Sequence, residues 1–159
     1  MVRWLSLAGS LVLASTPVGS SAQSVSDSVI ATTNGLFRAM LTHDTVALNR
    51  LLLPDARLTA VVPDGDSTIV RTSPGAAWAE RLGASSDTLL ERIWSPVVHV
   101  SDGVAALWAA YDFHRGGKFS HCGADAFTMV RTRSGWRITD ITYTVQRIGC
   151  RPSPLGPPR

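Results

Sequence analysis

The chain has 159 residues, of which 45% are hydrophobic, with 15 Lys and Arg against 12 Asp and Glu and a formal net charge of +3. No run of Lys or Arg is longer than a pair, and aromatic residues do not alternate with basic ones, so the composition gives no indication of nucleic-acid binding. The length suits one ordinary domain with a single hydrophobic core.

Residues 1–22 have the layout of a secretory signal peptide. Arg3 is followed by an apolar run over residues 4–14, by the helix breaker Pro17 and by small residues that end at Ala22. The run is too short to span a bilayer, and cleavage after Ala22 would release the rest of the chain. The alternative is a buried amino-terminal helix. We expect a secreted or periplasmic protein that has no membrane contact once the signal is removed.

Helices are predicted in the first half of the remaining chain. A capping pattern at 24–27 opens the first helix, Asp44 can cap a second and shorter one, and Ser73-Pro74 can start a third over residues 75–82. Between the second and third helices, two β-branched runs flank Asp64-Gly65-Asp66, which is typical of a hairpin.

The second half is predicted to be a meander of long strands. Tight turns at 102–103, 116–117 and 134–135 make neighbouring strands antiparallel, and Ser95-Pro96 indicates a bulge inside the first of them. The four predicted strands are 88–100, 104–115, 118–131 and 136–148. Helices followed by such strands predict an α+β domain over 24–150, in which a curled sheet packs on the helices as a cone with a cavity, and a disordered Pro-rich tail over 151–159.

A candidate site follows from the strand register. If Gly116-Gly117 is a two-residue turn, Asp112 faces His121 across the hairpin, and Trp108, Asp125 and Phe127 share their face of the sheet. Asp112 could then orient the imidazole as a general base, and Asp125 could be a proton donor whose pKa is raised by burial. The alternative is a surface ion pair with a half-exposed aspartate, and a shift of one residue would break the grouping.

Other chemistry has weaker support. A zinc site built from Asp112, His114, His121 and Asp125 has suitable ligand types but no ligand-spacing signature, so neither a metal nor a cofactor is expected. Ser120 cannot act as a nucleophile with His121, because adjacent strand residues point to opposite faces.

The two cysteines, Cys122 and Cys150, are the only ones in the chain. An even pair in an exported protein predicts a disulfide, with free thiols as the alternative. In the predicted hairpin Cys122 faces about position 146, so Cys150 would have to fold back past Gly149 to reach it.

The segments "RIWSPVVHVSDGVAALW" and "YDFHRGGKFSHCGADAFTMVRTRSGWRITDITYT" resemble the nuclear transport factor 2-like superfamily. The resemblance covers residues 25–150 and is greatest to exported bacterial members of unknown function, grouped as SnoaL-like or ketosteroid-isomerase-like. It implies the same cone fold and an open sheet face that often forms a homodimer. Members include isomerases, dehydratases, hydrolases and non-catalytic binding domains, so the resemblance does not select a function.

The isomerases of that superfamily hold a protonated aspartate in an Asp-x-Phe segment, which matches residues 125–127. The resemblance therefore implies that Asp125 points into the cavity. The position that matches the isomerases' general base is Ala60, and the first predicted helix contains no tyrosine to complete an oxyanion hole. Steroid isomerisation is therefore not expected.

Three functions remain open from the sequence. The first is a small-molecule-binding protein with a ligand in the cone, contacted by a set of five residues: Trp108, His121, Asp125, Phe127 and Tyr143. The second is a cofactor-free isomerase, dehydratase or hydrolase in which His121 is the base, Asp112 orients it and Asp125 is the acid. The third is a non-catalytic domain that forms a homodimer through its sheet.

Overall fold

A computed structural model describes residues 19–158, with side chains from residue 23 onward. Most of the expected signal segment lies outside these residues, and the boundaries at 22 and 150 stay predictions. The described chain forms three helices and six strands: α1 (Gly19–Leu41), α2 (Thr45–Leu51), β1 (Leu52–Asp64), β2 (Ser67–Pro74), α3 (Gly75–Gly83), β3 (Leu89–Ser101), β4 (Val104–Arg115), β5 (Lys118–Thr132) and β6 (Gly135–Thr144). Within the described residues, no helix combines the length and apolar character that a membrane crossing requires.

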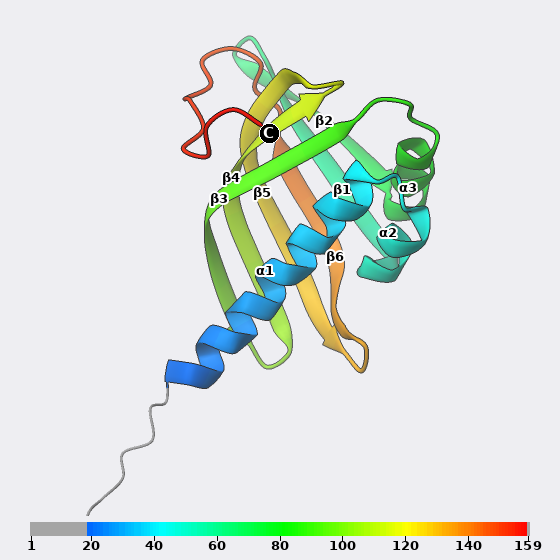
Figure 1. Cartoon of the computed structure of the whole chain (residues 1–159), viewed down its shortest axis with the longest axis vertical. Coiled ribbons are helices and arrows are strands. Elements are labelled where there is room, and N and C mark those ends of the chain that lie inside the picture. The colour runs from blue at the N-terminus through cyan, green and yellow to red at the C-terminus, as the bar shows by residue number, and fades with distance from the viewer. Residues whose placement is uncertain (1–18, 159) are drawn as a thin grey trace, which may run out of the picture.

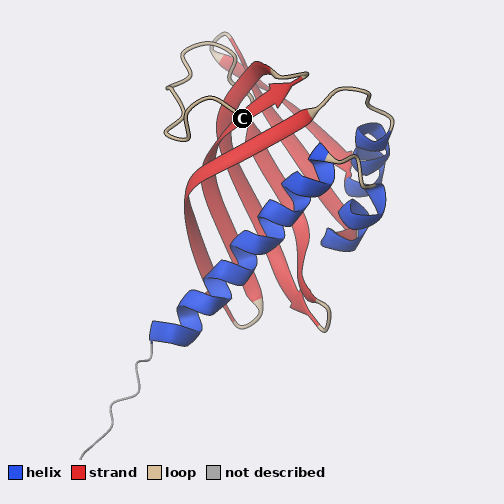
Figure 2. Ribbon diagram, viewed as in Figure 1, coloured by secondary structure: helices blue, strands red, loops and turns tan. Residues whose placement is uncertain are grey.

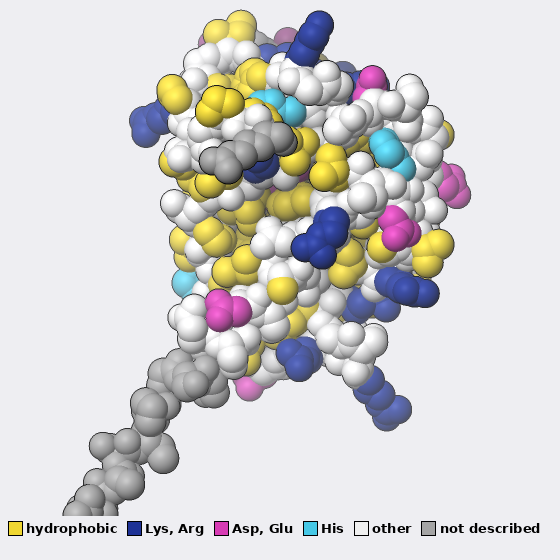
Figure 3. Space-filling model, in the orientation of Figure 1, with side chains coloured by type: hydrophobic (Ala, Val, Ile, Leu, Met, Phe, Trp, Pro, Cys, Tyr) yellow, Lys and Arg dark blue, Asp and Glu magenta, His cyan; other side chains and the backbone are white. Residues whose placement is uncertain are grey.

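The strands form one curved sheet in the order β2-β1-β6-β5-β4-β3. All neighbours are antiparallel except β1 and β6, which run parallel. Helix α1 lies across the concave face, and α2 and α3 lie together beside β1 and β2 (Figures 1 and 2). This is the predicted α+β cone. On the face of the molecule in Figure 3, basic side chains are scattered and form no single patch.

The predicted starts of α2 and α3 are confirmed, whereas that of α1 is not. Asp44 caps α2, since its carboxylate accepts a hydrogen bond from the Ala47 amide at 2.9 Å. Helix α3 starts at Gly75 as predicted, although its cap is Pro74, while the Ser73 hydroxyl instead accepts a hydrogen bond from Arg81. The prediction that α1 opens at 24–27 is wrong, because the helix is already formed at Gly19.

The hydrophobic core lies between α1 and the concave face of the sheet. Val29, Leu36 and Met40 of α1 are almost completely buried there. Phe37 meets the ring of Phe127 on β5 edge to face, with ring centroids 6.0 Å apart. Such aromatic pairs contribute about 1 kcal/mol beyond the burial of their surface. The core thus holds α1 over the middle of the sheet and leaves a cavity beside it.

Candidate functional site

A bulge at Ser120 decides which side chains enter the cone. Arg115 pairs with Lys118 and His114 with Phe119, as predicted, but the next partner of β4 is Phe113, which lies opposite His121. Ser120 is the extra residue, and one extra residue moves every following side chain of β5 to the other face relative to β4. The prediction that Asp112 faces His121 is therefore wrong.

Gly123 lets the ring of Tyr111 lie close to β5 and β6. A Cβ atom at residue 123 would be 2.8 Å from Cε1 of Tyr111 and 2.1 Å from the carbonyl oxygen of Thr144. The Tyr111 hydroxyl donates a hydrogen bond of 2.6 Å to that same carbonyl. The tyrosine therefore links β4 to β6 across the inner face of β5.

The inner face of the sheet, α1 and α3 enclose a cavity of about 120 Å³. Nine of its lining residues are apolar or aromatic without a titratable group, and the other five carry titratable groups. The lining residues are Leu36, Phe37, Met40, Leu58, Trp78, Leu82, Glu91, Tyr111, Phe113, His121, Asp125, Phe127, Ile141 and Tyr143. Four residues of the predicted ligand set, His121, Asp125, Phe127 and Tyr143, are among them.

Trp108, the fifth residue of the predicted set, does not line the cavity. It lies on the outer face of the sheet next to Val97, its partner on β3, and 51% of its surface is exposed. Because of the bulge, Phe127 pairs with Leu107, and Trp108 pairs with the exposed Ala126. The prediction of Trp108 as a cavity wall is wrong for the same reason as the Asp112–His121 pair.

Two carboxyl groups lie together in the cavity. Asp125 of β5 is buried, and its side chain interacts with that of Glu91 of β3. Burial raises the pKa of Asp125 to about 7, while burial and the charge of Asp125 raise the pKa of Glu91 well above its ordinary value. Two adjacent buried carboxyl groups cannot both ionise readily, so the pair retains a proton near neutral pH.

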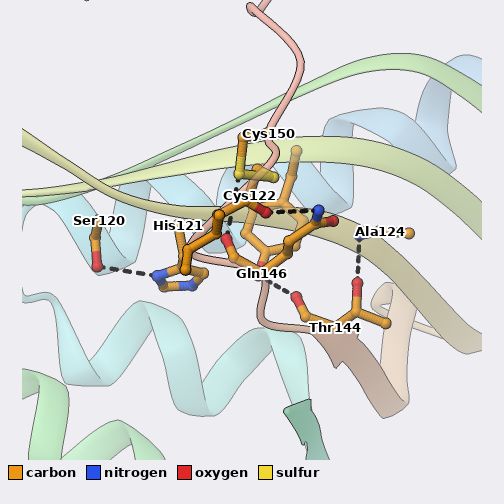
Figure 4. The surroundings of a disulfide bond; sticks show 9 residues. Ser120, His121, Cys122, Ala124, Thr144, Gln146 and Cys150 are labelled. Carbon is orange, nitrogen blue, oxygen red and sulfur yellow. Dashed lines mark hydrogen bonds between the residues drawn. A yellow bond between two sulfur atoms is a disulfide. The ribbon is translucent and has the colours of Figure 1, made fainter. Parts of the chain in front are cut away.

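His121 lies at the cavity wall and is held by its neighbours. Its ring stacks on Phe113 with centroids 4.8 Å apart and meets Tyr111 edge to face. Its Nδ1 atom is 3.0 Å from the Ser120 hydroxyl. Figure 4 shows the two side chains turned toward each other, so the expectation that they point to opposite faces is wrong, because Ser120 is the bulged residue. Burial and the positive charge of Arg147 lower the pKa of His121 to about 4. The imidazole is therefore neutral over the physiological range, and it is a weaker base than an ordinary histidine side chain.

Asp112 is buried on the opposite face of the sheet. Arg92, its partner on β3, donates two hydrogen bonds to its carboxylate, and His114 lies 3.5 Å away. Burial alone would raise its pKa, but the hydrogen bonds and charge of Arg92 hold the pKa of Asp112 below its ordinary value. The segment after Cys150 covers this group, since Ser153 also hydrogen-bonds to Asp112 and Arg92 donates to the Gly156 carbonyl. Asp112 is thus part of an ion pair on the face of the sheet opposite to His121.

Cys122 and Cys150 form the predicted disulfide (Figure 4). Cys122 pairs with Gln146 through two backbone hydrogen bonds, and the chain then turns back at Gly149, whose φ is +76°. This is the return path that the sequence predicted. A disulfide is consistent with an oxidising compartment.

The four residues of the possible zinc site are divided between two faces of the sheet. His121 and Asp125 line the cavity, whereas Asp112 and His114 lie together on the other side. Among residues 23–158, no group of three or more His, Cys, Asp or Glu side chains is placed to hold a metal ion.

Glu91 and Tyr111 are site residues that the sequence reading missed. Side chains alternate between the faces of a strand, so Glu91 shares its face with the apolar Leu89 and Ile93. This placement is the one sign in the sequence that Glu91 could point into the cone. Its significance depends on Asp125, which is two strands away in the sheet and 34 positions later in the chain. Local sequence carries no mark of such a pairing.

Structural comparison identifies many proteins of similar fold, although no family profile and no curated protein matches the sequence. A nuclear transport factor 2-like superfamily protein from Salmonella enterica serovar Typhimurium superposes with a TM-score of 0.64 at 13% identity, covering 82% of this chain and 96% of that one. A protein of the same type with a cystatin-like fold, from Novosphingobium aromaticivorans, gives 0.63 at 18% identity, covering 81% and 86%.

A protein of unknown function from Mycobacterium tuberculosis gives a TM-score of 0.66 at 14% identity, covering 84% of this chain and 80% of that one. Similarity at this level of identity concerns the fold and leaves the chemistry of the cavity open. The three helices and the curved six-stranded sheet of this chain therefore have the nuclear transport factor 2-like fold.

Proposed function

We propose that the protein binds a small, largely apolar molecule inside the cone and contacts its polar group with the Glu91–Asp125 pair. One observation carries this proposal: Oδ2 of Asp125 is buried and, among the described residues, has no hydrogen-bond partner. A buried polar atom without a partner is unfavourable by about 1–3 kcal/mol, and a ligand hydroxyl or carbonyl group would supply the missing hydrogen bond.

The size of the cavity limits the apolar part of the ligand. An apolar protein cavity of about 150 Å³ can hold a benzene-sized molecule. The cavity here, of about 120 Å³, has apolar walls from α1, α3 and β5 and therefore suits one ring or a chain of similar volume.

Titration of the full exported protein with cyclohexanone and 3-phenylpropanamide, followed by protein NMR, tests the proposal. Saturable shifts of the cavity residues are expected. Leu82→Trp should fill the cavity and weaken binding at least tenfold, whereas Val46→Trp, at a position 59% exposed on α2, should leave binding unchanged. Equal binding by the Leu82→Trp variant, or no saturable binding of either probe, would show that the cavity is not the binding site.

The second candidate is an acid/base enzyme that uses the same cavity. The observation in its favour is that a neutral imidazole, His121, and a proton-holding pair line one enclosed space. His121 would accept a proton from carbon α to a carbonyl, and Asp125 or Glu91 would protonate the carbonyl oxygen, giving an enol. Deuterium uptake by cyclohexanone in D2O measures this step. Wild type should accelerate it and His121→Gln and Asp125→Asn should not; full activity in either variant would contradict the mechanism.

We also propose that the protein works after export, supported by the signal-like segment 1–22 and the disulfide. Intact mass of the protein recovered from the producing cells should show cleavage after Ala22. A chain recovered inside the cytoplasm with residues 1–22 attached would contradict export. The homodimer suggested by the superfamily resemblance stays a prediction.

A further inference from the structure

We propose that the ligand carries an anionic group, a carboxylate or a phosphate monoester, which binds to Arg71, Arg81 and Arg147 beside the cavity. This inference rests on the proposed ligand-binding function and names the chemical class of the ligand. The three arginines come from three separate parts of the chain: strand β2, helix α3 and the segment after β6.

A second cavity, of about 320 Å³, adjoins the first. Leu58, Trp78, His121 and Tyr143 line both cavities, so the two share a wall. All three arginines line the second cavity, and no acidic side chain from the described part of the chain does. The inner cavity alone is smaller than the roughly 300–1,000 Å³ of typical ligand sites, so a ligand held there would extend into the outer cavity.

The sheet register places Arg71 on the inner face. Arg71 pairs with Ala60 on β1, Ala60 with Tyr143 on β6, and Tyr143 with Asp125 on β5. Cross-strand partners present their side chains on the same face, so Arg71 and Asp125 are two ends of one row. The methyl group of Ala60 leaves space within this row.

The other two arginines act on groups of the cavity wall. The charge of Arg147 lowers the pKa of His121, and the charge of Arg81 opposes the rise in the pKa of Tyr143 that burial causes. Both guanidinium groups therefore lie close to wall residues that the two cavities share.

The arginines are available for an anion. Among the described residues, none of the three forms an ion pair with a carboxylate, and the single side-chain hydrogen bond assigned to them runs from Arg81 to the Ser73 hydroxyl at 3.2 Å. Guanidinium groups bind carboxylates and phosphates in a bidentate manner, and three of them around one concave surface favour one anion over a neutral group.

The test uses four probes of similar body: 3-phenylpropionate, 2-phenylethyl phosphate, the neutral 3-phenylpropanamide and the cationic 3-phenylpropylamine. Titration calorimetry on the full exported protein should give at least tenfold tighter binding of the anions than of the amide, with the amine weakest. The tighter of the two anions identifies the group as carboxylate or phosphate. The advantage of the anions should shrink when salt is raised, because exposed charges are screened.

The variant Arg71→Gln/Arg81→Gln/Arg147→Gln should lose the preference for the anions and keep the amide affinity within about twofold, which also shows that it folds. The control Arg50→Gln/Arg57→Gln/Arg133→Gln removes the same charge from exposed positions that line neither cavity and should keep the preference. If wild type bound 3-phenylpropionate and 3-phenylpropanamide with equal affinity, this inference would be overturned and the cavity proposal would stand. No binding of any probe would overturn the cavity proposal itself.

Discussion

Asp125 on β5 and Glu91 on β3 lie together inside the cone, although strand β4 separates their backbones. The two carboxyl groups can still interact, because both side chains point to the concave face, where the curvature of the sheet brings them together. Burial raises the pKa of both groups. A pair that holds a proton near neutral pH can donate a hydrogen bond to a ligand oxygen, which an ionised carboxylate cannot do.

Asp125→Asn should change how stability depends on pH. The pKa of Asp125 is about 7 in the folded chain against an ordinary 3.8, so its contribution to stability is present below 3.8 and is lost as pH rises through 7. The loss is at most about 4 kcal/mol. The variant lacks it, so its free energy of unfolding, relative to wild type, should rise between pH 4 and 7.5. Urea denaturation at several pH values measures this.

The variant must be compared with wild type at each pH, because the titration of His121 changes the stability of both proteins in the opposite direction. Its pKa of about 4 in the folded chain lies below the ordinary 6.5, so the imidazole adds stability as pH rises through this range. Asp66→Asn, at an exposed turn position, is the control and should show no trend relative to wild type. A flat difference between Asp125→Asn and wild type would show that the carboxyl pair does not retain a proton.

Gly123→Ala should destabilise the fold by about 3 kcal/mol or more, because the new methyl group would overlap the Thr144 carbonyl and press on Tyr111. Thermal or urea denaturation checks this. Gly35→Ala on α1 is the control, since its Cβ would make an ordinary 3.6 Å contact with Leu51, and it should stabilise the helix by up to about 1 kcal/mol. Equal stability of the two variants would contradict the close approach at Gly123.

Arg92→Ala should destabilise the protein by about 3 kcal/mol, because it leaves the buried Asp112 carboxylate without its main partner. The double variant Arg92→Ala/Asp112→Asn should recover part of this loss, since no unpaired charge remains. Arg115→Ala removes an exposed ion pair with Asp87 and should cost less than about 1 kcal/mol. Urea denaturation compares all three, and a loss no larger than that of Arg115→Ala would mean that Asp112 is hydrated.

Cys122→Ser/Cys150→Ser should lower the free energy of unfolding by about 3 kcal/mol, because the bond closes a loop between positions 28 apart. Reduction of wild type should have a similar effect. Intact mass after alkylation, with and without reductant, shows whether the bond is present. Alkylation of both thiols in unreduced exported protein would refute it.

The elements of this fold follow from local sequence. Gly116 and Gly117 take positive φ values of 57° and 75° in the predicted hairpin, and Ser95-Pro96 interrupts β3 where a bulge was expected. Such signals act over a few residues through backbone sterics and missing donors, so they can be read without the rest of the molecule. The presence of three helices and the tight turns between the antiparallel strands were predictable for this reason.

Which side chains line the cavity was decided by the tertiary structure. Side chains in a strand alternate between faces, so the single extra residue at Ser120 exchanges Asp112 for Phe113 as the partner of His121. Neither neighbour of Ser120 in the chain, Phe119 or His121, is a glycine or proline that would mark this bulge.

Contacts between segments that are distant in the chain also shape the site. Tyr111 lies over Gly123 and donates a hydrogen bond to the Thr144 carbonyl on β6. The carboxyl-terminal segment, which the disulfide attaches to β5, covers Asp112 on the outer face. The sequence by itself determined the strands, the turns and the residue types available for chemistry. Only the folded sheet decided which of them face inward, because the alternation of faces depends on a count that one bulged residue reverses.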